Sequence, residues 1–283
     1  MSQPPQIVTA VAELRHRIAA FRQDDSRIGL VPTMGALHAG HLALVGETQK
    51  HADIVIVSIF VNPTQFAPHE DFDRYPRTLA ADAEKLGAAG ETDLIFAPSV
   101  GEMYPPDFAT RLEVSGPAEG LESDFRPHFF AGVATVVAKL LVAAMPDVAM
   151  FGEKDYQQLL VVRRMAADLG LPVQILGAPI VREADGLAMS SRNVYLSGEQ
   201  RRIAASLNLV LKGLVAELRN GATVAAAEDA GKRALLQSGF HSVDYLAVRD
   251  AATLAPLAAL DRPARVLAAA TVGSTRLIDN LAV

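Results

Sequence analysis

The sequence predicts an α/β fold with a parallel sheet, followed by a smaller α/β domain. Three observations favour this class. Apolar strand-like runs alternate with segments of helical periodicity up to about Val181, as in chains built from βαβ units. Glycine-containing or polar turns follow several of these runs, at the positions where open parallel sheets bind ligands. Beyond Val181 the composition changes to a polar segment and then to alanine-rich helical stretches.

The first domain is predicted to span residues 1–181. The segment Asp53–Val61 (DIVIVSIFV) is rich in β-branched residues and favours a buried strand, while Thr78–Gly90 has helical spacing and ends at a glycine. This alternation predicts a Rossmann-like parallel sheet with helices on both faces. The expected strands are Arg27–Thr33, Asp53–Val61, Asp93–Ala97, Asp147–Phe151 and Val173–Val181, and the expected helices are His38–Ala52, Thr78–Gly90, Gly132–Met145 and Glu153–Gly170.

The second domain is predicted to span residues 182–283, which is a typical domain size. It begins with the polar, turn-like segment Arg182–Asn193 (READGLAMSSRN). We expect this smaller α/β domain to act as a lid. Its expected elements are two helices, Gly198–Asn220 and Thr223–Ser238, and two extended segments around His241–Val248 and Arg265–Ala270.

Composition argues against several classes of function. Half of the 283 residues are hydrophobic, the formal net charge is −6, and there is no cysteine. An acidic chain lacks the basic surface that general nucleic-acid binding needs, and a chain without cysteine has no disulfides or thiolate metal sites. The N-terminal residues do not read as a signal peptide, and apolar runs such as Ile54–Val61 are too short to span a bilayer. We therefore expect a cytoplasmic protein with no nucleic-acid or membrane partner.

The first candidate site is Pro32–His41 (PTMGALHAGH), which follows a predicted strand and opens a predicted helix. Gly35 permits the tight turn. A helix N-terminus offers N–H groups and partial positive charge, which suit a phosphate group. His38 and His41 would share one helix face and donate hydrogen bonds to phosphate oxygens. The pair alone is also compatible with two surface histidines, or with a zinc site for which no third ligand has a familiar spacing.

The second candidate segment is Asn62–Phe66 (NPTQF), directly after the next predicted strand. Asn62 and Gln65 carry amides that both donate and accept hydrogen bonds, which suits hydroxyl and carboxylate groups of a ligand. Taken by itself, the segment is explained as simply by an ordinary Asn-Pro turn.

The third candidate segment, Phe151–Gln158 (FGEKDYQQ), again joins a strand to a helix. Lys154 is predicted in the first turn of that helix, where the dipole disfavours a cation unless an anion is bound. Asp155 could reach a ribose hydroxyl, and Gln158 would face the same side. The alternative is a set of solvated charges at a helix end.

The fourth candidate segment is Met189–Asn193 (MSSRN), between the two predicted domains. Its two hydroxyl groups and its guanidinium could form a mobile clamp for an anion. A loop of this kind that closes over a triphosphate would shield an activated intermediate from water. A plain linker would have the same composition.

Taken in order, these segments resemble pantothenate synthetases. PTMGALHAGH is similar to that family's form of the HIGH-type motif of the nucleotidyltransferase superfamily, and NPTQF, FGEKDYQQ and MSSRN follow at family-like distances. Arg74–Arg77 (RYPR) and Gly132–Leu140 (GVATVVAKL) are similar as well. The resemblance is close over residues 27–195 and looser beyond. It implies a ligase that condenses pantoate with β-alanine through a pantoyl adenylate, releasing AMP and pyrophosphate.

The resemblance also implies partners and residue roles. The partners would be ATP, pantoate and β-alanine, with Mg²⁺ held mainly by the phosphates and no metal ligands assigned to the protein, and the chain would form a homodimer. Gly152 and Asp155 would meet the ribose, and Met34 and Val181 would line the nucleotide site. The ATP site would comprise Met34, His41, Gly152, Lys154, Asp155, Val181, Met189, Ser190, Ser191 and Arg192; the catalytic residues would be His38, His41, Lys154 and Arg192; the pantoate site would comprise Gln65, Gln158 and Asn62.

One segment departs from the family pattern, and two other functions stay open. The family usually has Arg-Pro-Gly-His-Phe where this chain has Arg126–Phe130 (RPHFF), so His128 replaces a glycine and Phe129 replaces a histidine.

One alternative is an adenylyltransferase of the same superfamily, which would need cations for a phosphorylated acceptor. The neutral amides at Asn62, Gln65 and Gln158 argue against it. The other is a nucleotide-binding regulator with impaired catalysis, which only the altered segment supports.

Overall fold

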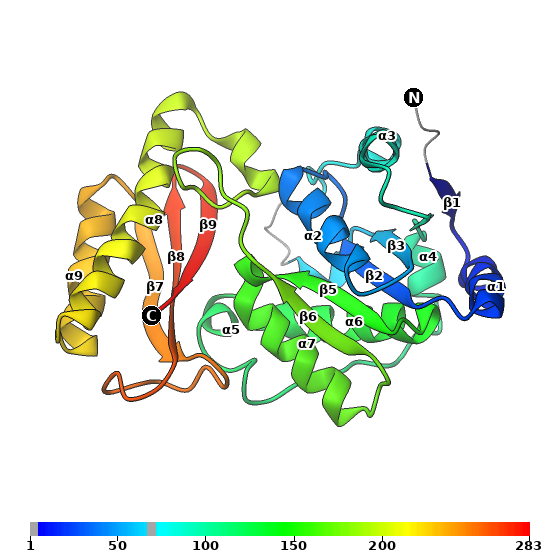
Figure 1. Ribbon diagram of the computed structural model, residues 1–283. Helices are drawn as coiled ribbons and strands as arrows, with labels where there is room; N and C mark the ends of the chain where they lie inside the picture. The colour runs from blue at the N-terminus through cyan, green and yellow to red at the C-terminus, as the bar shows by residue number, and fades with distance from the viewer. Residues whose placement is uncertain (1–4, 67–71) are drawn as a thin grey trace. The chain divides into compact units, whose positions relative to one another are not determined.

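The structure, a computed structural model, describes residues 5–66 and 72–283. Within this part of the chain there are two compact units (Figure 1). The first comprises the residues up to Glu153 together with Val161–Pro179, and the second comprises Lys154–Leu160 together with Ile180–Val283. One helix, α7 (Tyr156–Asp168), therefore begins in the second unit and ends in the first.

The first unit contains a six-stranded sheet with the order β1-β4-β3-β2-β5-β6, and its described pairings are parallel. The predicted parallel sheet is thus confirmed, and each of the five predicted strands is present. The strands are β1 (Gln6–Val8), β2 (Ile28–Thr33), β3 (Ile54–Ile59), β4 (Leu94–Phe96), β5 (Val148–Gly152) and β6 (Gln174–Ala178).

The order of the strands reverses at β2. From β2 the chain continues to β3 and β4 on one side of the sheet, and it later forms β5 and β6 on the other side. Such a reversal leaves a crevice beyond the carboxyl ends of the two central strands. Thr33 ends β2 and Gly152 ends β5, so the turns that follow both strands begin at this edge of the sheet.

Helices cover both faces of this sheet. Helices α2 (Ala39–Gln49) and α3 (Leu79–Ala89) share one hydrophobic cluster with strand residues such as Val31 and Val57. Alternate strand residues point to the opposite face, where Leu30 is also buried and α6 (Phe129–Ala144) contacts β2. The remaining helices of this unit are α1 (Val11–Phe21), α4 (Val100–Met103) and α5 (Glu122–Phe125), with short 3₁₀ helices η1 (Arg22–Asp24) and η2 (Pro63–Gln65).

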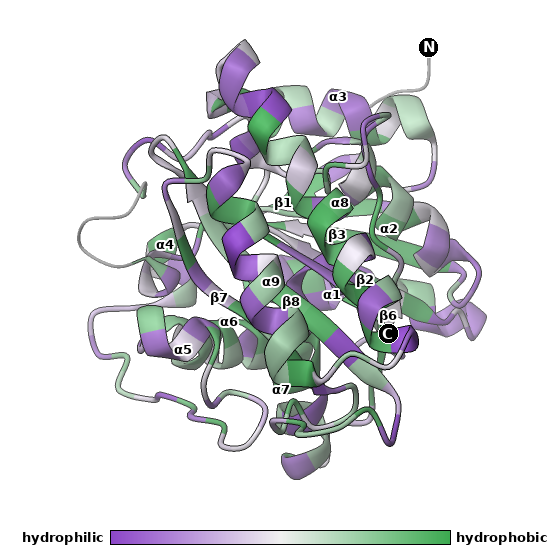
Figure 2. Ribbon diagram, turned by 90° about the vertical axis from the view of Figure 1, so that its left-hand side faces the viewer, coloured by the Kyte–Doolittle hydropathy of each residue, from purple (hydrophilic) through white to green (hydrophobic). Residues whose placement is uncertain are grey.

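The second unit has a three-stranded antiparallel sheet in the order β7-β8-β9 and two long helices. Helix α8 begins with a capping box, because the side chains of Ser197 and Gln200 each accept the backbone N–H of the other. Both helices are amphipathic, with hydrophobic and hydrophilic residues alternating along them (Figure 2). The elements are α8 (Gly198–Arg219), α9 (Val224–Gln237), β7 (Ser242–Asp250), β8 (Ala264–Val272) and β9 (Thr275–Ala282), preceded by η3 (Glu153–Asp155) and η4 (Ser191–Tyr195).

Strand β1, helix α1 and strand β9 are among the elements that were not predicted from the sequence. Strand β1 has only three residues, and α1 has an N-cap, Ala10, whose side chain makes no capping hydrogen bond. Strand β9 contains Asp279 and Asn280, residue types that are depleted in strands. In each case the local signal that marks the start or the type of an element is missing.

The first testable prediction concerns the close approach of α2 to β2. A Cβ at Gly29 of β2 would overlap the methyl group of Thr48 and lie 2.9 Å from the Cβ of Ala52. We expect Gly29→Ala to lower the free energy of unfolding by about 1–3 kcal/mol, because an overpacked core must shift. Urea denaturation followed by circular dichroism measures this change.

Gly213 of α8 provides the matched control. A Cβ there meets no described atom within 4 Å, so Gly213→Ala should raise stability by about 0.5–1 kcal/mol through helix propensity alone. If Gly29→Ala were as stable as Gly213→Ala, the close packing of α2 on β2 would be wrong.

Candidate active site

The chain leaves β2 through a turn that side-chain-bearing residues rarely adopt. Gly35 has a φ of 83° and Ala36 a φ of 51°, so two successive residues are in the left-handed region. Glycine adopts this conformation without penalty, but alanine does so at a cost. The Thr33 hydroxyl accepts the N–H of Gly35 at 3.2 Å and donates to the Ser58 carbonyl at 2.8 Å. The predicted tight turn at Gly35 is confirmed, and the strain at Ala36 has to be held by the surrounding structure.

A buried carboxylate, Asp82 in the first turn of α3, holds this turn. Its two oxygens accept the N–H groups of Ala36 at 2.9 Å and Leu37 at 2.8 Å. The Thr78 hydroxyl also donates to it, and the Nζ of Lys85 lies 3.9 Å away while donating to the carbonyl of Leu37 at 2.7 Å. A buried carboxylate is costly unless it is hydrogen-bonded and paired, and these four contacts provide both. The turn and α3 therefore stabilise each other.

The two histidines of the first motif form the N-terminal cap of α2. The Nδ1 atom of His38 accepts the N–H of Gly40 at 3.1 Å, and the Nδ1 atom of His41 accepts the N–H of His38 at 3.3 Å. The ring centroids are 4.1 Å apart. A ring nitrogen that accepts a hydrogen bond carries no proton, so each neutral imidazole has its proton on Nε2. In this tautomer the Nε2–H of each ring is a donor of the kind that a phosphate oxygen accepts.

This geometry corrects one detail of the sequence prediction. His38 was expected on the same helix face as His41, but it is the N-cap residue in extended conformation and precedes the helix. The rings are neighbours because of the capping hydrogen bonds and not because of helical spacing.

The amides of the second motif have unequal positions. Asn62 is 1% exposed, and its Nδ2 group donates to the side chain of Gln65 at 2.9 Å and to the carbonyl of Gly132 at 3.2 Å. Its Oδ1 accepts from the backbone and hydroxyl of Thr64 and from the Tyr104 hydroxyl. Since Nδ2 of Asn62 binds Oε1 of Gln65, the donor end of the Gln65 amide faces away from Asn62. The orientation of the Gln65 amide is thereby fixed, while the hydrogen bonds of Asn62 are used within the protein.

Tyr104 keeps its proton in this arrangement. Burial raises the pKa of its hydroxyl, and the hydrogen bonds with Thr64 and Asn62 only partly oppose that effect. The phenol is therefore a hydrogen-bond donor to Asn62 at neutral pH.

The segment that departs from the family pattern supports Gln65. The Nη2 group of Arg126 donates to the carbonyl of Gln65 at 3.0 Å, and Nη1 lies 3.7 Å from the Glu122 carboxylate. The guanidinium lies 4.0 Å from the centre of the Phe129 ring, a cation–π contact. His128 has a φ of −93°, a conformation that does not require glycine. His128 and Phe129, which replace the glycine and the histidine of the family pattern, are thus both compatible with the position of Arg126.

Lys154 was predicted in the first turn of α7, but it lies in the short helix η3 that precedes α7. Its Nζ lies 3.7 Å from the carboxylate of Asp155.

The polar segment after Val181 folds back on itself, because the N–H of Met189 donates to the Val181 carbonyl at 3.0 Å. Ser190 then caps η4, its hydroxyl accepting the N–H of Arg192 at 3.3 Å. The Met189–Arg192 segment is therefore an ordered turn at the start of η4.

Charged residues also hold the polar segment Arg182–Asn193 in place. Arg201 of α8 contacts the carboxylates of Glu183 and Asp185, each at 2.6 Å, and Asn193 donates to Glu183 at 2.8 Å. Burial alone would raise the pKa of Asp185, but the hydrogen bonds from Arg201 and from the N–H of Leu187, together with the charge of Arg201, lower that pKa.

The predicted site residues therefore form two groups. The structure brings His38 next to His41, and Asn62 next to Gln65, in the first unit, which also contains Met34 and Gly152. The second unit contains the others: Lys154, Asp155, Gln158, Val181, Met189, Ser190, Ser191 and Arg192. Apart from Asn62, each of these residues is partly accessible.

Sequence reasoning did not find Asp82, Arg126's contact with Gln65, or Tyr104. Asp82 lies 46 residues from Ala36 and forms part of an unremarkable alanine-rich helix. A Thr-x-x-x-Asp pattern at the start of that helix would not by itself indicate a role in a distant turn.

Comparison with known proteins agrees with these motifs. The family model described as "Pantoate-beta-alanine ligase" matches residues 6–282. The chain belongs to the pantoate–β-alanine ligase family. A curated relative from Paramagnetospirillum magneticum, named pantothenate synthetase, is 56% identical over 283 residues, covering 100% of this chain and 99% of the relative.

Solved structures give the same result. The crystal structure of pantothenate synthetase from Thermus thermophilus superposes with a TM-score of 0.90 at 50% identity, covering 98% of each chain. Pantoate–β-alanine ligase from Francisella tularensis, solved with "Beta-gamma ATP and Beta-alanine", has a TM-score of 0.83 at 32% identity and covers 98% of this chain and 97% of its own. The chain is accordingly a ligase of pantothenate biosynthesis, and the adenylyltransferase and regulator alternatives are not supported.

Two features are absent from residues 5–66 and 72–283. No group of three or more His, Asp or Glu side chains in this part of the chain could hold a metal ion. No helix there is long and apolar enough to cross a membrane.

The second testable prediction concerns Asp82. In Asp82→Asn one acceptor oxygen becomes an NH₂ group, so one buried N–H of the turn loses its partner, at a cost of about 1–3 kcal/mol. We expect lower thermal stability together with at least a tenfold loss of turnover, because the strained turn that presents the histidines is released.

Asp53→Asn is the control for this change. Asp53 also accepts a backbone N–H, that of Arg27 at 2.8 Å, but at the opposite end of β2 and in an exposed position. It should leave turnover within twofold of wild type. Equal turnover of the two variants would show that Asp82 does not control the geometry of the turn.

Proposed function

We propose that this ligase activates pantoate with Mg-ATP at the turn that follows β2. The pantoate carboxylate attacks the α-phosphorus of ATP, which forms pantoyl adenylate and releases pyrophosphate. The amine of β-alanine then attacks the acyl carbon, which forms pantothenate and releases AMP. The capped turn at His38 and His41 carries this proposal, because two Nε2–H donors and a helix N-terminus occur together at a strand end of the switch-point sheet.

The phosphate chain of ATP is proposed to bind to several side-chain donors. Imidazole N–H groups, the Lys154 ammonium, two hydroxyl groups and the Arg192 guanidinium are all donors to phosphate oxygens. The substrate carboxylate is itself the nucleophile, so the reaction needs no nucleophilic side chain. These groups would act by positioning the substrates and by stabilising charge that develops at the α-phosphate. The proposed phosphate contacts are His38, His41, Lys154, Ser190, Ser191 and Arg192.

Pantoate is proposed to bind to neutral amides. Gln65 presents its donor end away from Asn62, and Gln158 is partly accessible whereas the neighbouring Gln157 is buried. Amide donors can bind the hydroxyl groups and the carboxylate of pantoate without the strong electrostatic preference of a cation. Asn62 is proposed to contribute by holding Gln65, because its own hydrogen bonds lie within the protein.

The rest of the nucleotide is proposed to contact residues beside these donors. Gly152 and the carboxylate of Asp155 would meet the ribose, and Met34, Val181 and Met189 would line the site. Mg²⁺ would enter as Mg-ATP, since this ion is commonly held by substrate phosphates together with few protein ligands.

Three further properties are also proposed, the first from the family resemblance and the other two from the composition of the chain. They are a homodimer in solution, a cytoplasmic location, and a division at residue 181 into an ATP- and pantoate-binding domain and a lid. Light scattering of the purified protein tests the first, because a particle with the 30.1 kDa mass of one chain would exclude a dimer.

The third testable prediction concerns the reaction itself. Purified protein with Mg-ATP and D-pantoate should release pyrophosphate only when pantoate is present, and AMP and pantothenate should accumulate only when β-alanine is added. Removal of Mg²⁺ with EDTA should abolish both reactions. A well-folded preparation that releases no pantoate-dependent pyrophosphate would refute the proposed activation step.

The fourth testable prediction concerns His41. We expect His41→Ala to lower turnover at least about a hundredfold, the scale on which losing one donor to transition-state charge is felt. The lost cap should cost only about 0.5–2 kcal/mol of stability, so the variant stays folded. His51→Ala, an exposed histidine just beyond α2, is the control and should keep wild-type turnover. A loss below about threefold in His41→Ala would remove this residue from the proposed phosphate contacts.

A further inference from the structure

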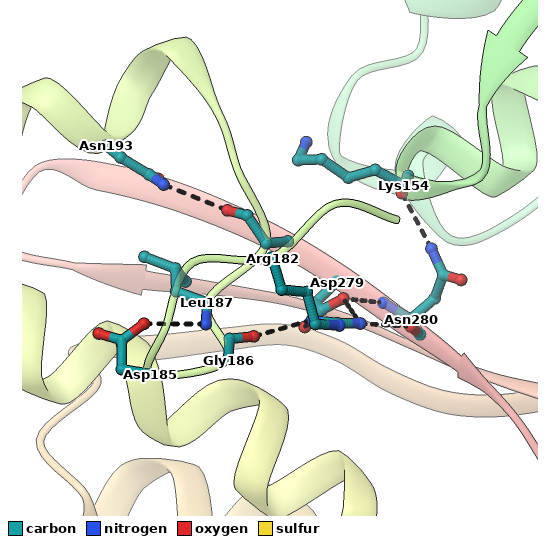
Figure 3. Close-up of polar contacts among 9 residues, drawn as sticks. Lys154, Arg182, Asp185, Gly186, Leu187, Asn193, Asp279 and Asn280 are labelled. Carbon is teal, nitrogen blue, oxygen red and sulfur yellow. Dashed lines mark hydrogen bonds and ion pairs between the residues drawn. The ribbon is translucent and has the colours of Figure 1, made fainter. Parts of the chain in front are cut away.

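Two neighbouring residues of β9 each hold a segment of the proposed nucleotide site. Asn280 and Asp279 are both 2% exposed, although β9 lies at one edge of its sheet. Buried polar residues in a strand are unfavourable for folding unless they are satisfied. Figure 3 shows where their hydrogen bonds go: one side chain reaches Lys154 and the other reaches Arg182.

Asn280 holds the backbone of Lys154. Its Nδ2 group donates to the Lys154 carbonyl at 2.9 Å, across 126 residues of sequence (Figure 3). Lys154 belongs to the short helix η3, in which backbone hydrogen bonding is limited. A side-chain donor on the carbonyl therefore restricts the position from which the lysine side chain extends.

Asp279 holds the start of the polar segment that ends in Met189–Arg192. Its fully buried carboxylate forms a bidentate pair with Arg182, at 2.7 and 2.9 Å. The same guanidinium donates to the Gly186 carbonyl at 3.0 Å and to the Asn280 carbonyl at 3.3 Å. Arg182 also pairs with Ala188 through its backbone, so the fold-back that leads to Met189 is fastened to β9.

The two contacts are linked at β9 itself. The N–H of Asn280 donates to the Asp279 carboxylate at 2.7 Å. A movement of this strand would therefore displace Lys154 and the Arg182 fold-back together.

We propose that Asp279 and Asn280 are positioning residues for the ATP-dependent step. They keep Lys154 and the Ser190–Arg192 turn at a fixed spacing, so that both meet one phosphate chain. The inference rests on the proposed phosphate contacts of these residues. A purely structural role would also explain buried polar contacts, so the test must separate stability from nucleotide affinity.

The fifth testable prediction is a double-mutant cycle between Asn280 and Lys154. Asn280→Ala should raise the KM for ATP at least tenfold and lower kcat, while the KM values for pantoate and β-alanine stay within about twofold. In the Lys154→Met background the same Asn280→Ala change should alter the KM for ATP by less than about twofold, because its effect acts through Lys154. Equal effects in both backgrounds would overturn the positioning role.

Leu277→Ala on the same strand is the matched control. Leu277 is 4% exposed and belongs to the hydrophobic core of the second unit, so its truncation lowers thermal stability without touching Lys154. It should leave all three KM values within about twofold. If Leu277→Ala raised the KM for ATP as much as Asn280→Ala, the effect would be a consequence of lost stability and the inference would fail.

Two further variants keep the outcomes distinct. Asn280→Ser retains a hydroxyl donor and should show a smaller increase in the KM for ATP than Asn280→Ala; it also replaces Asn280→Ala in the cycle if that variant does not fold. Lys154→Met alone tests the proposed phosphate contact. Unchanged kinetics in Lys154→Met would refute that contact, whereas impaired Lys154→Met with unchanged Asn280→Ala would refute only the positioning role.

Discussion

The turn that carries the proposed phosphate site depends on one buried carboxylate. Asp82 accepts two successive N–H groups of the turn after β2, and this allows Ala36 to keep a left-handed backbone next to Gly35. The turn in turn places His38 as the cap of α2, and the cap fixes which nitrogen of each imidazole carries the proton. A single ionisable side chain on α3 thereby controls the hydrogen-bonding character of the two histidines.

The same indirect arrangement recurs elsewhere in the molecule. Asn62 orients Gln65 through its amide, and Arg126 holds the backbone of Gln65 from α5's C-terminal end. Asn280 holds the backbone of Lys154. Gln65 and Lys154 are thus each held by a buried asparagine, which is the arrangement that preorganised sites require. Amide and guanidinium groups can fill this role because both donate hydrogen bonds to carbonyl oxygens.

The sequence predicts elements and motifs well where the signal is local. The strand that ends at Thr33 and the turn at Gly35 are encoded by adjacent residues, and so is helix α8, whose predicted start at Gly198 matches the structure. The residues that hold those motifs lie far away in the sequence, as Asp82 lies far from Ala36, and no local pattern predicts these contacts. Strand β9 was not predicted because Asp279 and Asn280 disrupt the apolar pattern that is typical of a strand. Both residues are polar because they bind other segments of the chain.

The contact between Asn280 and Lys154 also has a consequence for how the protein is made. On the ribosome, Lys154 is synthesised 126 residues before Asn280, so at roughly 5–20 residues per second the two are separated by roughly 6–25 s of translation. The strands of the parallel sheet all precede residue 179, so they are complete while β9 has not yet been made. A nascent chain can therefore form its sheet early, but the lysine acquires its final support only after β9 has been made.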